Sequence, residues 1–470
     1  MIPAAGLCAL SAVDLTARLK RRAVSCREVV AAFLDRIDQL NPVYNAIVSL
    51  RPRDEILADA EAADCASPEA RAAQPLFGLP IAIKDLAITK GLRTTFGSPI
   101  FADFVPGADD LHVARIRAAG AIIIGKTNAP EFGLGSQTYN RVFGATRNAY
   151  NPALTAGGSS GGAAVALALR MLPIADGSDF GGSLRNPAAY NNVYGLRPSQ
   201  GRVPAYPADD AFLSQLSTDG PMARSVADLA LLLSVQAGHD PRAPLSLEGT
   251  AEAFRLPLPS PAKGQRICWL GDWGGALPME PGVLAVCETA LKRLTAIGCA
   301  VEPLTPGFDA EDLWQAFVTL RHYSVGGKLK VHYDNPAQRP LMKPEAAWEV
   351  EQSLAATVHD LRKAAIVRTC WFATVSKLFE RFDFLALPSA QVFAFPVEQH
   401  WPVSINGVAM DSYHRWMQVV TPGTMSGCPV ISIPAGFDPT GRAMGLQLIG
   451  RPRADLDVLR LAAAYETAAV

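Results

Sequence analysis

The sequence predicts an α/β protein with a mixed β-sheet core, helices on both faces of the sheet, and a mostly helical insertion. Short apolar runs alternate with glycine-rich turns and helical patterns between residues 79 and 237, as in a sheet that helices cover. The same texture returns after residue 381, whereas long helical patterns fill residues 281–380. We therefore expect one domain over residues 1–470, with an interrupted sheet.

Helices should form the N-terminal part, residues 1–66. Ser25 and Glu28 have the spacing of a capping box, and apolar residues follow at helical intervals from Val29 to Leu40. Asn41 and Pro42 should end this helix, because proline lacks the N–H that a helix interior needs.

The α/β core should comprise residues 67–237 and 381–470. Its expected strands are the apolar runs at 79–83, 121–124, 165–171, 193–196, 384–388, 430–434 and 445–449. A capped helix from Ser225 to Ala237 closes the first part, and a last helix begins near Ala454.

Residues 238–380 read as a variable, mostly helical insertion. Five prolines, at positions 241, 244, 257, 259 and 261, mark a linker or a long surface excursion. One further strand is expected at 266–270, before the long helices.

Composition excludes several classes of protein. With 43 basic and 44 acidic residues the formal net charge is −1, so bulk charge gives no attraction to nucleic acid or to an anionic membrane. The eight cysteines are scattered, without the paired spacing of a zinc site, and no charged region of a signal peptide precedes the first apolar stretch. We expect reduced thiols, a cytoplasmic location, and no metal or cofactor.

Two short motifs match familiar expressions. Residues 120–127 fit a P-loop, but the interior AIII is typical of a buried strand, so Lys126 should only cap or flank that strand. Residues 158–162 fit a nucleophile elbow centred on Ser160, yet a turn-rich loop precedes them where the elbow needs a strand.

A distributed pattern is more specific. Lys84 ends the run GLPIAIK, the serine loop 157–162 follows, and Ser183 lies 23 positions after Ser160 in the segment DFGGSLR. A lysine and two serine loops, with no suitable histidine, describe a serine hydrolase with an unusual base.

The chain resembles the amidase signature family over most of its length. The glycine- and serine-rich segment 155–198 carries the resemblance, together with GLPIAIKD, GAIIIGKTNAPEFGLG (120–135), STDGPMARSVADLA (217–230) and the C-terminal blocks within 428–450, in the family's order. The resemblance implies the family's fold and a substrate-facing role for the variable region.

The resemblance also implies roles for individual residues. Ser183 would be the nucleophile, Ser159 a bridging serine after a cis peptide at Gly158, and Lys84 the base. The backbone of Phe180, Gly181, Gly182 and Ser183 would form the oxyanion hole, supported by Gly158, Ser160, Asp179 and Arg185. Asp179 and Arg185 should hold the loop through an ion pair or backbone hydrogen bonds. We assign none of the tryptophans between residues 314 and 371 to the site.

A lysine base must be uncharged to accept a proton, and an ordinary lysine pKa is about 10.4. Burial at the end of an apolar strand would lower it. Because adjacent side chains on a strand point to opposite faces, we expect Asp85 to point away from the ammonium of Lys84.

The expected reaction is hydrolysis of linear amides through an acyl-enzyme, with carbamates (urethanes) and esters as further substrates. Partners would be small-molecule amides or carbamates, and the assembly a monomer or a homodimer. Two alternatives remain open: a glutaminase similar to the glutamyl-tRNA amidotransferase A subunit, and a non-catalytic binding protein on the same fold.

Overall fold

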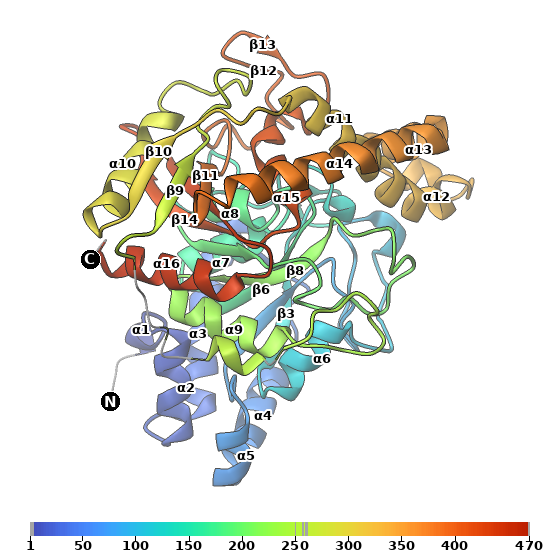
Figure 1. Cartoon of the computed structure of the whole chain (residues 1–470). Coiled ribbons are helices and arrows are strands. Elements are labelled where there is room, and N and C mark those ends of the chain that lie inside the picture. Colours follow the sequence, from blue (N-terminus) through green and yellow to red (C-terminus); the bar gives the residue numbers. More distant parts are fainter. Residues whose placement is uncertain (1–3, 250, 256–257, 259–261, 469–470) are drawn as a thin grey trace.

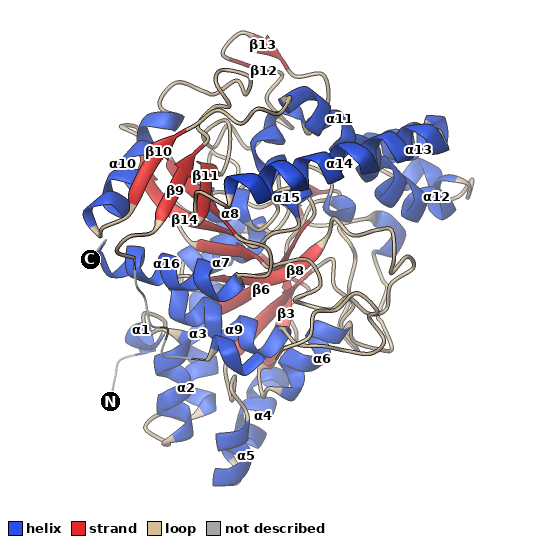
Figure 2. Cartoon of the chain, in the orientation of Figure 1, coloured by secondary structure: helices blue, strands red, loops and turns tan. Residues whose placement is uncertain are grey.

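Two β-sheets of different size lie at the centre of the chain (Figures 1 and 2). The computed structural model describes residues 4–249, 251–255, 258 and 262–468. The larger sheet has eight strands, in spatial order β10 (Ala300–Pro303), β9 (Arg266–Trp269), β11 (Phe384–Pro388), β15 (Ala443–Gly450), β14 (Val430–Phe437), β7 (Tyr194–Arg197), β8 (Thr218–Ala223) and β6 (Ile174–Asp179). The smaller sheet has β1 (Ile47–Val48), β3 (Ile122–Thr127) and β2 (Pro80–Lys84). Two short hairpins pair β4 (Tyr139–Asn140) with β5 (Gly144–Ala145) and β12 (Ser404–Ile405) with β13 (Val408–Ala409).

The mixed character of the core is confirmed. β9 pairs in parallel with β10 and β11, whereas the other neighbours in the large sheet are antiparallel. The early strands β2 and β3 do not join this sheet, because β2 meets β6 through the side chain of Asp176 and forms no backbone ladder with it. Residue 84 is thereby brought against the end of β6.

The N-terminal helices are α1 (Ala4–Leu7), α2 (Ala12–Lys20), α3 (Cys26–Tyr44), α4 (Arg53–Asp64) and α5 (Pro68–Ala73). The capping box of Ser25 and Glu28 is confirmed at the start of α3. The expected stop at Asn41 and Pro42 is wrong: the helix runs through Pro42 and ends at a left-handed Asn45. Pro42 lies in the last turn, where its ring removes one hydrogen bond without breaking a long following segment.

The core helices are α6 (Leu111–Ala118), α7 (Gly161–Ala168), α8 (Arg185–Tyr190), α9 (Val226–Gln236), α15 (Thr421–Ser426) and α16 (Asp455–Ala468). The capped helix after Ser225 is confirmed as α9. The strand expected at 165–171 is wrong, because most of that run belongs to α7. Its alanines and leucines are strong helix formers, and the two glycines before it allow close packing at the start of the helix.

Residues 238–380 supply both strands and helices. β9 and β10 extend one edge of the large sheet, and the helices are α10 (Val283–Ala296), α11 (Ala310–Arg321), the π-helix η4 (His322–Gly326), α12 (Gly327–Tyr333), α13 (Pro344–Ala355) and α14 (Val358–Leu378). In Figure 1, α11 to α14 lie at the opposite end of the molecule from the N-terminal helices. Of the expected linker prolines, Pro257, Pro259 and Pro261 lie outside the described residues.

Short 3-10 helices complete the chain: η1 (Pro99–Phe101), η2 (Glu131–Gly133), η3 (Ala251–Phe254), η5 (Arg339–Leu341) and η6 (Arg415–Val420).

Burial shows that helices cover both faces of the large sheet. Every residue of β15 is buried, although successive side chains point to opposite faces. Two large hydrophobic clusters result, one including α10, α14 and α16 and the other the N-terminal helices with β2, β3 and α7. Among the described helices, none is both long and apolar enough to cross a membrane.

Candidate active site

Lys84 ends β2 inside the protein, with only 1% of its surface exposed. Its Nζ lies 2.8 Å from Ser159 Oγ, 2.8 Å from Ser160 Oγ and 3.0 Å from Ser178 Oγ, and 3.2 Å from the Ser178 carbonyl oxygen. The carbonyl can only accept, whereas each hydroxyl can donate or accept. An uncharged amine can therefore donate two hydrogen bonds here and still accept one from a serine.

Burial lowers the pKa of Lys84 to about 7, against the opposing pull of the carboxylates of Asp176, Asp219 and Asp179. None of these carboxylates makes a direct ion pair with the amine. The neighbouring Asp85 points away, as predicted from strand alternation, and accepts hydrogen bonds from Thr95 Oγ1 at 2.5 Å and Thr95 N–H at 3.0 Å. At neutral pH a substantial fraction of Lys84 is thus uncharged.

The serine loop leads directly into α7, whose N-cap is Ser160. The peptide bond between Gly158 and Ser159 is cis, as the family resemblance implies. Gly158 has no room for a side chain, since a Cβ there would lie 3.0 Å from the backbone nitrogen of Gln137. The loop is consequently packed tightly behind Ser159.

Ser183 lies between β6 and α8, next to the serine loop. Its carbonyl accepts a hydrogen bond of 3.2 Å from the Ser160 N–H. Ser183 keeps 7% of its surface exposed, and its hydroxyl has no hydrogen-bond partner in the described part of the chain. The structure joins Lys84 to Ser159, and it contains no hydrogen bond from the Ser183 hydroxyl to either; such contacts are often long before substrate binds.

The expected set of four oxyanion donors needs one correction. The N–H of Gly182 donates to Asp179 Oδ1 at 2.8 Å, so it is engaged within the loop. The N–H groups of Phe180, Gly181 and Ser183 have no acceptor among the described residues. Gly182 instead shapes the turn: its φ is +94°, and a Cβ there would lie 2.9 Å from Val420.

A buried ion-pair network holds this loop. Asp179 Oδ2 accepts from the Leu184 N–H at 3.1 Å and from Arg185 Nε at 3.0 Å, and Arg197 lies 3.2 Å from Asp179 Oδ1. Burial alone would raise the pKa of Asp179, but Arg185 and Arg197 hold it well below its ordinary value. Asp179 therefore acts as a fixed anion that accepts two backbone N–H groups.

An aromatic wall from the variable region faces the same loop. The ring of Phe180 lies 6.1 Å from that of Phe317 on α11 and 5.2 Å from the Arg321 guanidinium. A Cβ on Gly181 would lie 3.0 Å from Phe317, so this ring closes over the loop. Trp314 supports Phe317 at 5.6 Å.

Arg321 is held within the wall by a carboxylate and a phenol. Its Nε lies 2.7 Å from Glu349 Oε1, and its NH2 donates to the Tyr413 hydroxyl at 2.8 Å. Tyr413 donates to Glu349 at 2.5 Å, and His322 Nδ1 lies 2.7 Å from the other carboxylate oxygen. Burial, offset by the carboxylate and the tyrosine, leaves the pKa of Arg321 raised. The wall offers the site aromatic surface, and the charge of Arg321 in it is balanced by Glu349.

Ser178, Asp176, Arg197 and the Arg321 cluster were not among the residues predicted from sequence. The run IADGSD, in which β6 carries two carboxylates and a hydroxyl, is a signal for the first two. The pairing of Arg321 with Glu349 has no local signal.

The two short motifs have structural roles. Residues 122–127 form β3, where Lys126 is buried and donates to the Ala87 carbonyl at 2.5 Å and Thr89 Oγ1 at 2.8 Å, so no loop is free to hold phosphate. Lys126 therefore lies within the strand. A loop precedes Ser160, and the elbow geometry is missing there.

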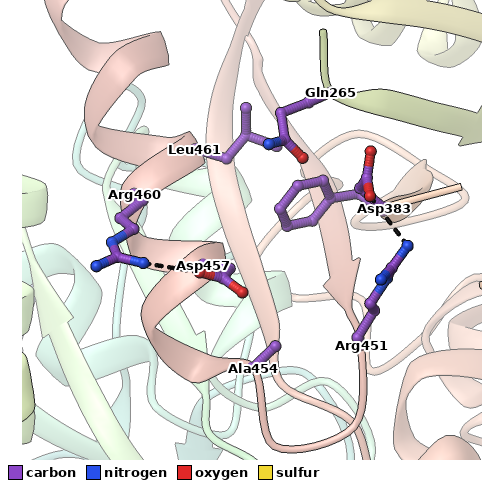
Figure 3. Close-up of a pocket in the computed structure, with 8 residues that line it drawn as sticks. Gln265, Asp383, Arg451, Ala454, Asp457, Arg460 and Leu461 are labelled. Atoms are coloured by element: carbon purple, nitrogen blue, oxygen red, sulfur yellow. Dashed lines mark hydrogen bonds and ion pairs between the residues drawn. The ribbon is translucent and has the colours of Figure 1, made fainter. Parts of the chain in front are cut away.

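A shallow pocket of about 190 Å³ lies elsewhere, between β11 and α16 (Figure 3). Arg451 is paired with Asp383 at 3.0 Å, and Arg460 with Asp457 at 3.1 Å. None of its lining residues belongs to the serine loops or the wall. The described residues contain no group of three or more His, Cys, Asp or Glu side chains suited to a metal ion.

Comparisons with known proteins agree with one another. The amidase family model matches residues 28–459. An acylamidase of Rhodococcus erythropolis is 34% identical over 97% of this chain and 95% of its own, and the glutamyl-tRNA(Gln) amidotransferase A subunit of Thermosynechococcus vestitus is 34% identical over 96% of each. The crystal structure of a bacterial aryl acylamidase of the amidase signature family superposes with a TM-score of 0.89 at 29% identity, covering 98% of this chain and 96% of that one.

Proposed function

This chain belongs to the amidase signature family and is an amide-hydrolysing enzyme, and we propose that Ser183 is its nucleophile, Ser159 its proton relay and Lys84 its base. The observation that carries the proposal is the contact of 2.8 Å between Ser159 Oγ and a lysine whose pKa burial lowers to about 7. Such a lysine is about nine-tenths uncharged at pH 8.

In the first step, Ser183 turns about its Cα–Cβ bond to donate to Ser159. Ser183 Oγ forms a bond to the amide carbonyl carbon while its proton passes to Ser159 Oγ, and the Ser159 proton passes to the Lys84 lone pair. The carbonyl oxygen becomes an oxyanion. Its donors would be the free N–H groups of Phe180, Gly181 and Ser183.

In the second step the C–N bond breaks. The proton returns from Lys84 through Ser159 to the leaving nitrogen, which departs as a neutral amine. Water then attacks the acyl-enzyme, giving its proton to the same relay, and the acid is released as Ser183 recovers its hydroxyl. The base is restored at the end of each cycle.

We propose an amide with an aromatic or apolar group as the substrate. The aromatic wall supports this choice, since Phe180 and Phe317 border the loop and Arg321 is ion-paired with Glu349. The names of two relatives, an acylamidase and an aryl acylamidase, point the same way. A second candidate is glutamine, which the similarity to amidotransferase A subunits favours; a zwitterion would need fixed, unpaired charges in the pocket.

A substrate panel tests this choice. Purified enzyme is given an aryl amide, free glutamine and an aryl carbamate, and release of aniline or ammonia is measured. We expect kcat/KM to be highest for the aryl amide. Faster release of ammonia from glutamine would instead indicate the glutaminase function. Urethane cleavage is a secondary prediction, and it would be wrong if the enzyme released no aniline from the carbamate. A fluorophosphonate should label Ser183 in the wild-type protein and should not label the Ser183→Ala variant. This result distinguishes an enzyme from a binding protein.

We further propose a cytoplasmic location and a monomeric or homodimeric assembly. A cytoplasmic location is supported by the eight cysteines, all of which are free thiols in the structure. A monomer or a homodimer is the expected assembly, which light scattering of the purified chain measures.

A further inference from the structure

A chain of charged groups, in which His112 and Asp176 are buried and Asp219 is partly exposed, connects the backbone of Lys84 to helix α6. Asp176 Oδ1 accepts a hydrogen bond of 3.0 Å from the Lys84 N–H. Its other oxygen lies 3.5 Å from His112 Nε2, and His112 Nδ1 lies 3.5 Å from Asp219 Oδ2. His112 is 3% exposed and Asp176 1% exposed, so water screens these interactions little.

The carboxylates around His112 favour its charged form. Burial by itself would lower the pKa of His112. The nearby carboxylates of Asp219, Asp176 and Asp110 outweigh this effect and raise the pKa to about 9. These carboxylates come from β8, β6 and the start of α6, and Lys126 of β3 faces Asp176 and Asp110. On α9, which packs against α6, Asp228 is occupied by the Val13 N–H.

The same two carboxylates act on Lys84. Asp176 and Asp219 both favour its charged form, which is the form that cannot act as a base. The third carboxylate, Asp179, is already paired with Arg185 and Arg197. Two carboxylates and one imidazolium leave a single net negative charge behind Lys84, whereas the carboxylates without the imidazolium would leave two.

We propose that His112 and Asp176 are positioning residues of the hydrolytic reaction, which fix the end of β2 and balance the negative charge behind the base. This inference rests on the proposed role of Lys84. Asp176 anchors the backbone from which the lysine side chain extends. The His112 cation offsets one carboxylate, and it thereby keeps the uncharged amine accessible near neutral pH.

The test compares the wild type, a single variant and a double variant in the pH dependence of kcat/KM for an aryl amide. His112→Asn removes the cation, so the acidic limb of the profile should move upward by about one pH unit. Asp219→Asn added to this variant restores one net negative charge, and the limb should return to within about 0.3 pH unit of the wild-type position. A control, Asp228→Asn, removes a carboxylate that is more buried than Asp219 and is not among those that act on Lys84, and it should leave the limb in place.

A merely structural role for His112 predicts a different pattern. His112→Asn would then lower the rate without moving the limb, or the double variant would remain as displaced as the single one, and either result overturns the inference. Thermal unfolding of each variant confirms that folded enzyme is compared. The proposed role of Lys84 fails separately, if Lys84→Met retains the wild-type rate and profile.

Discussion

Two buried basic side chains near the oxyanion loop, Lys84 in the core and Arg321 in the wall, have opposite surroundings. Both are nearly inaccessible, at 1% and 5% exposure. Lys84 is surrounded by serine oxygens and its pKa is lowered, whereas Arg321 contacts a carboxylate and a phenol and its pKa is raised. Burial alone therefore does not decide whether a basic side chain keeps its proton. The partner decides whether the group can lose its proton or becomes a fixed structural charge.

The largest effect should follow removal of the base. Lys84→Met fills the same space without an amine, and we expect kcat/KM at pH 8 to fall about 10³-fold, within the range of general-base catalysis. Lys126→Met is the matched control, because Lys126 is also buried but donates to Ala87 and Thr89. It should lower Tm and change kcat/KM by less than about tenfold. Equal losses in the two variants would remove the distinction between these lysines.

Removal of the wall carboxylate should act on stability. Glu349→Ala leaves Arg321 buried without its anion, and the free energy of unfolding should fall by about 3–5 kcal/mol. Glu311→Ala breaks the ion pair with Arg415, in which Glu311 is half exposed. This substitution should change the free energy of unfolding by less than about 1 kcal/mol. Urea denaturation measures both. Similar losses would show that the wall does not depend on its buried ion pair.

A milder change in the wall should appear in substrate binding. Phe317→Leu removes the aromatic ring that lies beside Phe180. KM for an aryl amide should therefore rise about three- to tenfold, with kcat little changed. A small aliphatic amide serves as the control substrate, and its KM should not move. If both substrates respond alike, Phe317 contributes to packing and not to selection of the substrate.

The smallest effect is expected within the serine loop. Ser160 and Ser159 lie equally close to Lys84 Nζ, but only Ser159 is proposed to carry the proton. Ser160→Ala should lower kcat by less than about tenfold, because Ser178 still supplies a hydroxyl to the amine. Ser159→Ala should cost at least a further tenfold. Steady-state kinetics that reverse this order would reassign the relay.

Sequence could predict the core better than the wall for a physical reason. Lys84, Ser159 and Ser183 each lie in a short segment that resembles a block of the amidase signature family, so the resemblance of the segment itself locates them. Arg321, Glu349 and Tyr413 meet only because three distant segments pack together, and no local periodicity encodes that contact. For the same reason, the sequence did not indicate that His112 lies close to Asp176, which binds the backbone of Lys84.

Local ambiguity explains the errors in the fold. The run within α7 is short and almost continuously apolar, and periodicity alone does not distinguish a buried helix from a buried strand in such a run. Similarly, the engagement of Gly182 by Asp179 depends on how the loop folds back on the end of β6, which composition does not specify.

The central claim, that an uncharged Lys84 draws the proton from Ser183 through Ser159, is tested most directly by the pH dependence of fluorophosphonate labelling at Ser183. Mass spectrometry locates the adduct on Ser183, and samples quenched at successive times give the rate of labelling. Because only the unprotonated amine is active, the rate should rise about tenfold per pH unit below pH 7 and level off above pH 8, and Lys84→Met should abolish the rise. A rate that is flat from pH 6 to 9, or an unchanged profile in Lys84→Met, would contradict the account.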